Sequence, residues 1–304
     1  MRIVVTGGAG FIGSHVVEKV LERGWEPIVV DDLSAGTVQH LPQGVVLLQV
    51  DVRDIDQWVP AVGSADAVIH LAAQINVAVS EKEPMRDTAI NVLGTVAALE
   101  AARQLGARAF RLASSAAVYG DNPRLPLREE EMPAPFSHYG LNKWIAEQYV
   151  DYYRRVHQVP ATILRLANVY GPRQRTQGEG GVVAIFTEAL VRGQPIQIDG
   201  DGQQTRDFVF VGDVAEAFLH RLGEAEGDVY NVATAREVTI NQLWERLRQF
   251  RNAPVPAPRY GAPRVGDIRF SRLATEKAGA WGFWAQTPLD EGLSLTWQDF
   301  QHRT

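Results

Sequence analysis

The sequence predicts an α/β protein with a Rossmann-type doubly wound parallel sheet and a smaller C-terminal α/β substrate domain. Short β-branched runs alternate with amphipathic helical stretches over the first two-thirds of the 304 residues. A glycine-rich loop directly follows the first run, and the chain becomes rich in Gly, Gln and Arg over 171–181. Because parallel strands are joined by helical crossovers, this alternation predicts βαβ units with helices on both faces of one sheet.

The same patterns place the individual elements. Buried strands are expected at 2–6, 25–32, 45–52, 66–72, 109–115 and 160–166. Helices are expected at about 12–23, 84–105, 138–157 and 182–193. The segment 196–214 reads as a strand, a turn and a second strand, and the Pro-rich 253–267 as a loop. We expect a dinucleotide-binding domain over 1–167, to which 207–233 returns, and a substrate domain formed by 168–206 and 234–304.

Composition excludes several classes of protein. The formal net charge of −6 leaves no basic footprint for nucleic acid, and no apolar run reaches the roughly 18 residues of a membrane span. The absence of cysteine excludes disulfides and thiolate chemistry, and no metal site is expected. Met1 and Arg2 lead directly into the apolar run 3–5, which predicts a core strand rather than a signal peptide and hence a cytoplasmic protein.

The glycine loop TGGAGFIG (6–13) suits a dinucleotide. Gly7, Gly10 and Gly13 have GxxGxxG spacing between a predicted strand and a predicted helix. The glycines allow a tight turn and close approach of the backbone to a pyrophosphate, while the helix N-terminus supplies free N–H groups. The alternative is a tight strand–helix turn with no ligand.

Asp31 and Asp32 end the second predicted strand, about 20 residues beyond the loop. A carboxylate there accepts hydrogen bonds from the adenosine ribose, and two of them would repel a 2′-phosphate, so NAD is predicted over NADP. A turn-initiating Asx pair is the alternative. Asp51 and Val52, at the end of the third strand, suit an adenine contact.

Tyr139 and Lys143 are the candidate acid–base pair. Their spacing of four places both on one face of the helix predicted over 138–157. A nearby ammonium favours tyrosinate and lowers the tyrosine pKa, as a general base requires, and Lys143 can also hold a ribose. An ordinary surface pair is the alternative. Ser114 and Ser115 end a strand at the edge where open α/β sheets bind ligands, and from position alone either could be a polar strand end.

An ordered set of motifs makes the chain similar to a known family. TGGAGFIGSH, DDLSAG, HLAAQ, SSAAVYG, YGLNK, RLANVYGPRQ, GDGQQTRDFVFVGDVA and RVGDIRFS occur in this order. From residue 2 to about 295 the chain resembles the extended short-chain dehydrogenase/reductases that act on nucleotide sugars, in particular the UDP-glucose 4-epimerase-like members.

The resemblance implies NAD as cofactor and gives roles to single residues. Tyr139 becomes the base on the sugar 4-hydroxyl, Lys143 tunes it, and Ser115, three before Val118 of the VYG match, is the third catalytic residue. The implied cofactor contacts are Gly7, Gly10, Phe11, Ile12, Gly13, Asp31, Asp32, Leu33, Ser34, Gly36, Asp51, Val52, Leu71, Ala72, Ala73, Asn91, Ser114, Tyr139 and Lys143.

The resemblance also implies a set of substrate contacts. Asn168 would contact the nucleotide diphosphate, Arg206 and Arg264 would bind its phosphates, and Asp267 would contact the ribose. Ser115, Gln197 and Ser271 complete the set. Arg206 in a surface ion pair with Asp207, and Arg264 as a loop charge, are the alternatives.

Four positions distinguish related enzymes. Ala116 and Ala117 stand where 4,6-dehydratases carry acid–base residues, and decarboxylases usually carry a Glu at the second, so both activities are disfavoured. Ser271 is small where epimerases restricted to small sugars have a bulky Tyr, which predicts acceptance of N-acetylated sugars. Ile75 replaces a Lys that lies near the cofactor phosphates in several epimerases, which puts the tightness of NAD retention in doubt.

The implied activity is epimerisation at C4 of a UDP-hexose, UDP-glucose or UDP-galactose, through a 4-keto intermediate, in galactose and carbohydrate metabolism. The alternatives are a UDP-glucuronate 4-epimerase, an NAD(P)H-dependent 4-ketoreductase and, more remotely, a non-catalytic cofactor-sensing protein. A homodimer through a four-helix bundle is implied for the helices at 84–105 and 138–157, with packing inside the subunit as the alternative. The apolar positions behind this expectation include Val92, Val96, Ala97, Leu99, Tyr149 and Tyr153.

Overall fold

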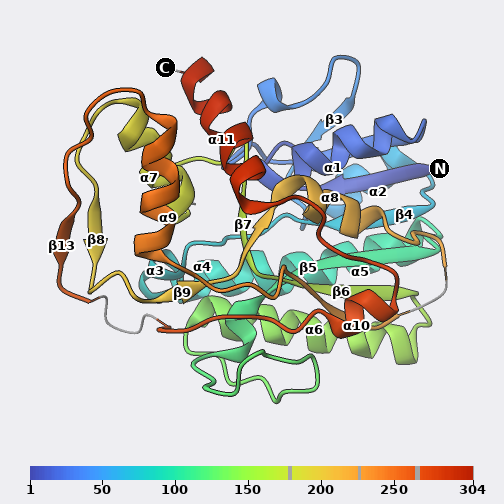
Figure 1. Ribbon diagram of the computed structural model, residues 1–304. Helices are drawn as coiled ribbons and strands as arrows, with labels where there is room; N and C mark the ends of the chain where they lie inside the picture. The colour runs from blue at the N-terminus through green and yellow to red at the C-terminus, as the bar shows by residue number, and fades with distance from the viewer. Residues whose placement is uncertain (177–179, 225–226, 264–267, 304) are drawn as a thin grey trace. The chain divides into compact units, whose positions relative to one another are not determined.

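The computed structural model describes residues 1–176, 180–224, 227–263 and 268–303 (Figure 1). They form two compact units. The first combines residues 1–119, 133–166 and 215–230, and the second combines 120–132, 167–214 and 231–304. None of the helices in the described ranges has the length and hydropathy of a membrane span.

A seven-stranded sheet forms the centre of the first unit. Its strands are β1 (Arg2–Thr6), β2 (Glu26–Asp31), β3 (Val46–Gln49), β4 (Ala67–His70), β5 (Ala109–Ser115), β6 (Ala161–Leu166) and β11 (Val229–Val232). Their order is β3-β2-β1-β4-β5-β6-β11, and the pairs from β3 to β6 are all parallel. This is the doubly wound order, so the predicted fold class is confirmed.

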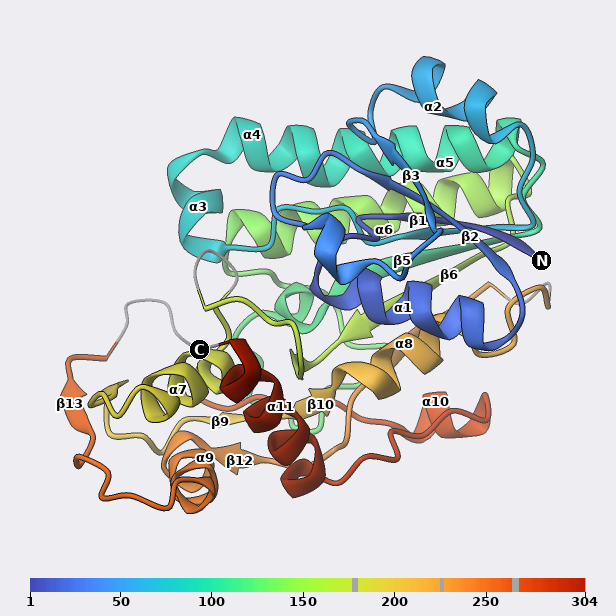
Figure 2. The same cartoon turned by 90° about the horizontal axis from the view of Figure 1, so that it is seen from above.

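Helices cover both faces of this sheet, as buried parallel strands require. They are α1 (Phe11–Glu22), η1 (Val38–His40), α2 (Ile55–Val62), α3 (Val77–Lys82), α4 (Pro84–Thr88), η2 (Ala89–Leu93), α5 (Gly94–Gln104), η3 (Ala116–Tyr119) and α6 (His138–Val156). Figure 2 shows α2 and α5 on one side of the strands and α1 on the other. Trp58, Leu99 and Val150 pack with strand residues Val4 and Phe110 into one buried core.

The helix expected over 84–105 is present but interrupted. α4 runs into α5 through η2, a π-helical turn over Ala89–Leu93. A π turn carries one more residue per hydrogen-bonded ring than an α-helix and often marks a functional site. The predicted cofactor contact Asn91 lies in this turn and is buried.

The second unit contains three small strand pairs. Its elements are β7 (Asn168–Tyr170), α7 (Val182–Val191), β8 (Gln197–Asp199), β9 (Thr205–Arg206), β10 (Phe208–Phe210), β12 (Val238–Thr239), α9 (Ile240–Leu247), η4 (Arg248–Phe250), β13 (Arg259–Gly261), α10 (Glu276–Ala280) and α11 (Leu289–Arg303). α7, α9 and α11 bury Phe186, Leu190, Leu243, Trp244 and Trp297 in one apolar cluster. α8 (Val211–Leu219) and β11 contain points where the chain passes between the units.

Two local expectations in the second unit were wrong in detail. The segment 196–214 forms β8, β9 and β10, which pair with β13, β12 and β7 respectively, and helix α8 begins at Val211. The loop expected over 253–267 contains β13, whose Arg259 pairs in parallel with Gln197. The pairing partners lie between 32 and 62 residues apart in sequence and leave no local pattern, which explains both differences.

The glycine loop joins β1 to α1 and lies against the end of β4. Gly7 has φ +69°, and a Cβ at this position would lie 2.6 Å from the Ala72 nitrogen. At Gly13 a Cβ would lie 2.1 Å from the Gly7 carbonyl oxygen. Only glycine fits such approaches of backbone to backbone, so the sequence has no freedom at these two positions.

Gly7→Ala is expected to lower the free energy of unfolding well below that of Gly24→Ala. Gly24 has the same φ of +69° but no atom within 4 Å of its built Cβ, so it is a matched control. Gly24→Ala should cost about 1–2 kcal/mol for left-handed backbone, and Gly7→Ala should cost about 1–3 kcal/mol more for overpacking. Urea denaturation of both variants measures this, and equal losses would contradict the close approach.

Candidate active site

The carboxyl ends of the parallel strands bring the predicted cofactor residues to one edge of the sheet. Gly10 is the N-cap of α1, has no side-chain cap, and is followed by a first turn without an acidic residue. The first N–H groups of α1 and its positive dipole end are therefore suited to an anion. The loop around them accepts no Cβ at Gly7 or Gly13. These features fit the pyrophosphate of a dinucleotide.

The two carboxylates at the end of β2 have different surroundings. Asp31 is buried: Ala9 N and Leu33 N donate to its two oxygens at 2.9 and 2.8 Å. Burial raises the pKa of Asp31, while these two bonds oppose the rise. Asp32 is exposed and accepts Ser34 N and Ser34 Oγ at a single oxygen, Oδ1. Asp31 thus connects the glycine loop to the turn, and Asp32 Oδ2 takes no part in the two bonds from Ser34 and suits a hydroxyl donor.

The turn after β2 is strained where a ribose would lie. Leu33 adopts φ 61°, a left-handed conformation that is uncommon for a branched residue. Gly36 lies against the loop, since its Cβ would be 2.8 Å from the backbone of Ala9. The glycine loop and the acidic turn therefore form one packed surface. Both carboxylates fit NAD, because a 2′-phosphate beside them would be repelled.

Three further predicted cofactor contacts, Asp51, Ala72 and Asn91, form hydrogen bonds within the protein. Asp51 is paired with Arg53, and this bond is the main cause that lowers the pKa of Asp51. Ala72 N donates to Thr6 Oγ1 at 3.3 Å, close to the glycine loop. Asn91 uses its side-chain amide within the protein, accepting Gln74 N and donating to Gln74 O. Asn91 therefore shapes the cofactor-side loop from within.

α6 positions the candidate catalytic pair. The Ser137 side chain caps the helix by accepting Gly140 N at 3.1 Å, so Tyr139 lies in the first turn. The Tyr139 nitrogen donates to Ser80 Oγ at 3.1 Å. Lys143 follows one turn later, with Nζ 5.9 Å from the centre of the Tyr139 ring. This arrangement places an ammonium beside the phenol, as predicted from the spacing.

Lys143 is buried at the end of β5. Its Nζ donates to the Ala113 carbonyl oxygen at 3.0 Å. Burial lowers the pKa of Lys143 to about 8, while Asp87 and Glu147 oppose the change. His70 bonds to hydroxyls of Thr6 and Thr95, and burial, helped by Lys143, lowers its pKa to about 3. Lys143 is thus the charged member of this pair near neutral pH.

The two serines at the end of β5 have different roles. Ser114 is buried and donates its hydroxyl to Glu147 Oε1 at 2.5 Å. Ser115 is half-buried, and its Oγ accepts Ala117 N at 3.2 Å, which leaves its proton for a ligand. The geometry favours Ser115 over Ser114 as the hydroxyl that meets a substrate.

Apart from Ser115, the predicted substrate contacts that are described lie in the second unit. Asn168 begins β7, Gln197 is exposed on β8, and Arg206 is half-buried on β9. Ser271 is half-buried, and Arg264 and Asp267 lie outside the described residues. Asp207 is fully buried and accepts Thr234 and Ala235, so it is not an exposed partner for Arg206.

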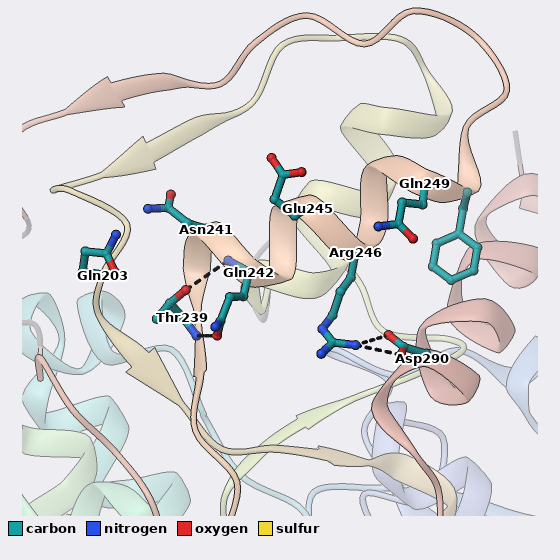
Figure 3. Close-up of a pocket in the computed structure, with 9 residues that line it drawn as sticks. Gln203, Thr239, Asn241, Gln242, Glu245, Arg246, Gln249 and Asp290 are labelled. Carbon is teal, nitrogen blue, oxygen red and sulfur yellow. Dashed lines mark hydrogen bonds and ion pairs between the residues drawn. The ribbon is translucent and has the colours of Figure 1, made fainter.

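A separate pocket of about 820 Å³ lies on the second unit (Figure 3). It is lined by Gln203, Thr239, Asn241, Gln242, Glu245, Arg246, Gln249, Phe250 and Asp290. Thr239 and Gln242 cap α9 reciprocally, and Arg246 pairs with Asp290 at 2.6 Å. The polar side chains of Thr239, Gln242, Arg246 and Asp290 therefore bond within the pocket wall. None of the residues that line the pocket is a predicted site residue.

Comparison with known proteins identifies the family. Residues 3–233 match the NAD dependent epimerase/dehydratase family. The chain belongs to this family. A UDP-glucose 4-epimerase of Mycolicibacterium smegmatis is 39% identical over 313 residues, which cover 100% of both chains. The predicted resemblance is therefore confirmed.

Solved structures agree with this assignment. UDP-glucose 4-epimerase from Thermotoga maritima, with UDP-glucose, matches at a TM-score of 0.93 and 40% identity, covering 100% of this chain and 99% of that one. The Thermus thermophilus UDP-glucose 4-epimerase complex with NAD matches at 0.92 and 38%, covering 100% of both.

Sequence reasoning missed a buried ion pair behind the catalytic residues. Arg165 Nε and Nη2 donate to Glu147 at 3.0 and 2.7 Å, with side chains 5% and 2% exposed. The Arg165 guanidinium also lies 4.8 Å from the Tyr119 ring centre. Glu147 follows Lys143 by four residues, so helical periodicity would have placed it on the catalytic face. It fixes Ser114 and, through it, the end of β5.

Arg165→Met is expected to lower the free energy of unfolding by about 3–5 kcal/mol, because it leaves the Glu147 carboxylate buried without its partner. Arg86→Met is the control, since its pair with Glu83 is 58% and 51% exposed and should contribute at most about 1 kcal/mol. Chemical denaturation compares them. A loss for Arg165→Met no larger than the control's would show that Glu147 does not depend on this guanidinium.

Proposed function

We propose that the protein epimerises UDP-hexoses at C4 with NAD as a resident cofactor, interconverting UDP-glucose and UDP-galactose. The observation that supports the proposal is the position of Lys143 Nζ, which lies 5.9 Å from the centre of the Tyr139 ring and bonds Ala113 of β5, the strand that ends at Ser115. Three relatives that match over the whole chain are UDP-glucose 4-epimerases, one of them with UDP-glucose and one with NAD.

The residues of the chain handle the proton. The Lys143 ammonium stabilises the Tyr139 phenolate, which takes the proton of the sugar 4-hydroxyl. Ser115 donates to the same sugar oxygen and holds it in place. NAD, when bound, would accept the C4 hydride and return it to the opposite face of the 4-keto sugar. The loop N–H groups and Asp32 would hold the cofactor's pyrophosphate and ribose.

The second unit would bind the nucleotide. Arg206 and Arg264 suit the diphosphate, Asn168 and Gln197 add polar contacts, and Asp267 suits the ribose. Binding energy from this non-reacting part of the substrate leaves the sugar free to turn between the two half-reactions. Ser271, small and half-buried, supports acceptance of N-acetylated sugars.

The other candidate activities predict different requirements. A 4-ketoreductase would consume added NAD(P)H, and a UDP-glucuronate 4-epimerase would favour a carboxylated sugar. Ala116 and Ala117 lack the acid–base groups of the dehydratases. Purified enzyme incubated with UDP-galactose and no added reduced cofactor should produce UDP-glucose, and parallel assays on UDP-GlcNAc and UDP-glucuronate define the sugar range. A strict need for reduced cofactor would overturn the proposal.

Tyr139→Phe should lower turnover by about 10²-fold or more, the usual contribution of a positioned acid–base group. Tyr152→Phe, on an exposed position of the same helix, should keep wild-type turnover. UDP-galactose conversion measures both. Undiminished activity of Tyr139→Phe would remove this tyrosine from the mechanism.

We further propose a cytoplasmic homodimer through a four-helix bundle. Of the apolar positions behind this expectation, Val92, Leu99 and Tyr153 are buried within the subunit, whereas Tyr149 is 40% exposed. Leu93, Tyr152 and Val156 add exposed apolar surface on the same helices. This surface suits a second copy of the chain.

Light scattering after size exclusion should give twice the chain mass of 33.6 kDa. A charge on the exposed apolar surface should split the assembly, so Leu93→Glu is expected to yield a monomer. Met132→Glu, at a position 76% exposed and in neither of the two helical segments, should stay dimeric. A monomeric wild type contradicts the dimer.

A further inference from the structure

Asp87 is a fully buried carboxylate that the proposed chemistry does not use. It lies in α4 with 0% of its surface exposed. Gln74 Nε2 and Asn91 Nδ2 donate to its Oδ1 at 2.6 and 3.0 Å, and Asn142 Nδ2 donates to its Oδ2 at 2.6 Å. In the described part of the chain no ion pair includes it. A buried carboxylate held by neutral amides is costly unless a positive charge lies nearby.

Lys143 is that positive charge. Asp87 bonds Asn142, the residue directly before Lys143 on α6, so its carboxylate meets this helix next to the lysine, and both side chains are buried. Burial disfavours the Lys143 ammonium, and among the groups that oppose this effect Asp87 comes before Glu147. A buried carboxylate acts strongly on a buried ammonium, because solvent screens the interaction between them only weakly.

The other titratable groups around Lys143 do not supply an uncompensated negative charge. Glu147, also on α6, is bound by two nitrogens of Arg165 from β6, which offset its charge. His70 from β4 stays neutral, because burial lowers its pKa to about 3. Tyr139 shares the helix face with Lys143. Asp87 is thus the carboxylate near Lys143 that no guanidinium offsets.

The same carboxylate organises two segments of the cofactor side. Gln74 directly follows the predicted contacts 71–73, and Asn91 lies in the π turn. Asp87 accepts from both side-chain amides, and the Asn91 amide also bonds the backbone N–H and carbonyl of Gln74. Asp87 therefore touches the loop after β4, the π turn and α6 at once.

We propose that Asp87 is the buried counter-charge of the Lys143 ammonium and is a positioning residue that acts on the reaction through Lys143. It keeps this lysine charged at the pH where the Tyr139 phenolate must form. The effect of Asp87 on the reaction rests on the proposed function, whereas its effect on the charge of Lys143 does not. A residue that served only as a hydrogen-bond hub would not control the titration of Lys143.

The lysine content of the chain allows a direct test. Only Lys19, Lys82, Lys143 and Lys277 are present, so NMR of enzyme labelled with 13C,15N-lysine and saturated with NAD gives four side chains to titrate. Lys143→Arg assigns the signal of Lys143. In the wild type this signal should titrate near pH 8, because burial lowers the pKa of Lys143 to about 8.

Asp87→Asn removes the negative charge, so the pKa of Lys143 should fall by about one unit or more, a tenfold change in its acid dissociation constant. The alkaline limb of the kcat–pH profile should move down by the same amount. Glu83→Gln is the matched control: it removes an acid four residues earlier, 51% exposed, and should leave Lys143 unchanged. Lys19, whose ion pairs are with Glu22 and Glu216, should not shift in either variant.

Asp87→Asn that lowers the melting temperature but leaves the Lys143 titration unchanged would overturn the proposal. Asp87→Ser is the second variant if Asp87→Asn does not fold, because its shorter side chain leaves room for water where the carboxylate was. A wild-type Lys143 that is already uncharged at pH 7 would also overturn it. The titration needs no turnover: an enzyme that fails to epimerise UDP-galactose but shows the shift refutes the proposed function and supports the counter-charge.

Discussion

A buried ammonium organises the site of the first unit. Lys143 lies under the end of β5 with its Nζ held by the Ala113 carbonyl. The α6 periodicity places Tyr139 one turn before it and Glu147 one turn after it, so one helix face carries the phenol, the cation and a carboxylate. Burial disfavours the charged form of Lys143. The Ala113 carbonyl and the nearby carboxylates must therefore stabilise the ammonium. The proposed chemistry therefore depends on the packing of α4, α6 and β5 as much as on the reactive groups.

Burial separates neighbours that are chemically identical. Ser114 faces inward and serves Glu147, while Ser115, one residue later, keeps its proton for a ligand. Asp31 likewise faces inward and binds loop N–H groups, whereas Asp32 is exposed. Side chains alternate in direction along a strand, so Ser114 and Ser115 at the end of β5 point to opposite faces, and Asp32 directly follows the last residue of β2.

The glycine loop shows how the fold creates the cofactor surface. Gly7 meets the backbone after β4, and Gly36 meets Ala9, so three chain segments approach without side chains between them. The backbone N–H groups at the start of α1 then remain accessible to an anion. The second unit supplies separate polar groups, such as Arg206 and Ser271, on short strands and connections.

The sequence by itself determined the parallel sheet, the glycine loop, the acidic turn and the Tyr139–Lys143 spacing, because each depends on local periodicity or on motifs of a few residues. It did not reveal Asp87, the Glu147–Arg165 pair or the pairing of β8 with β13. These depend on residues that lie between 18 and about 60 positions apart and meet only when the chain is folded. The tertiary structure also decided which of Ser114 and Ser115 is buried, because burial is a property of the packed chain and not of the residue type.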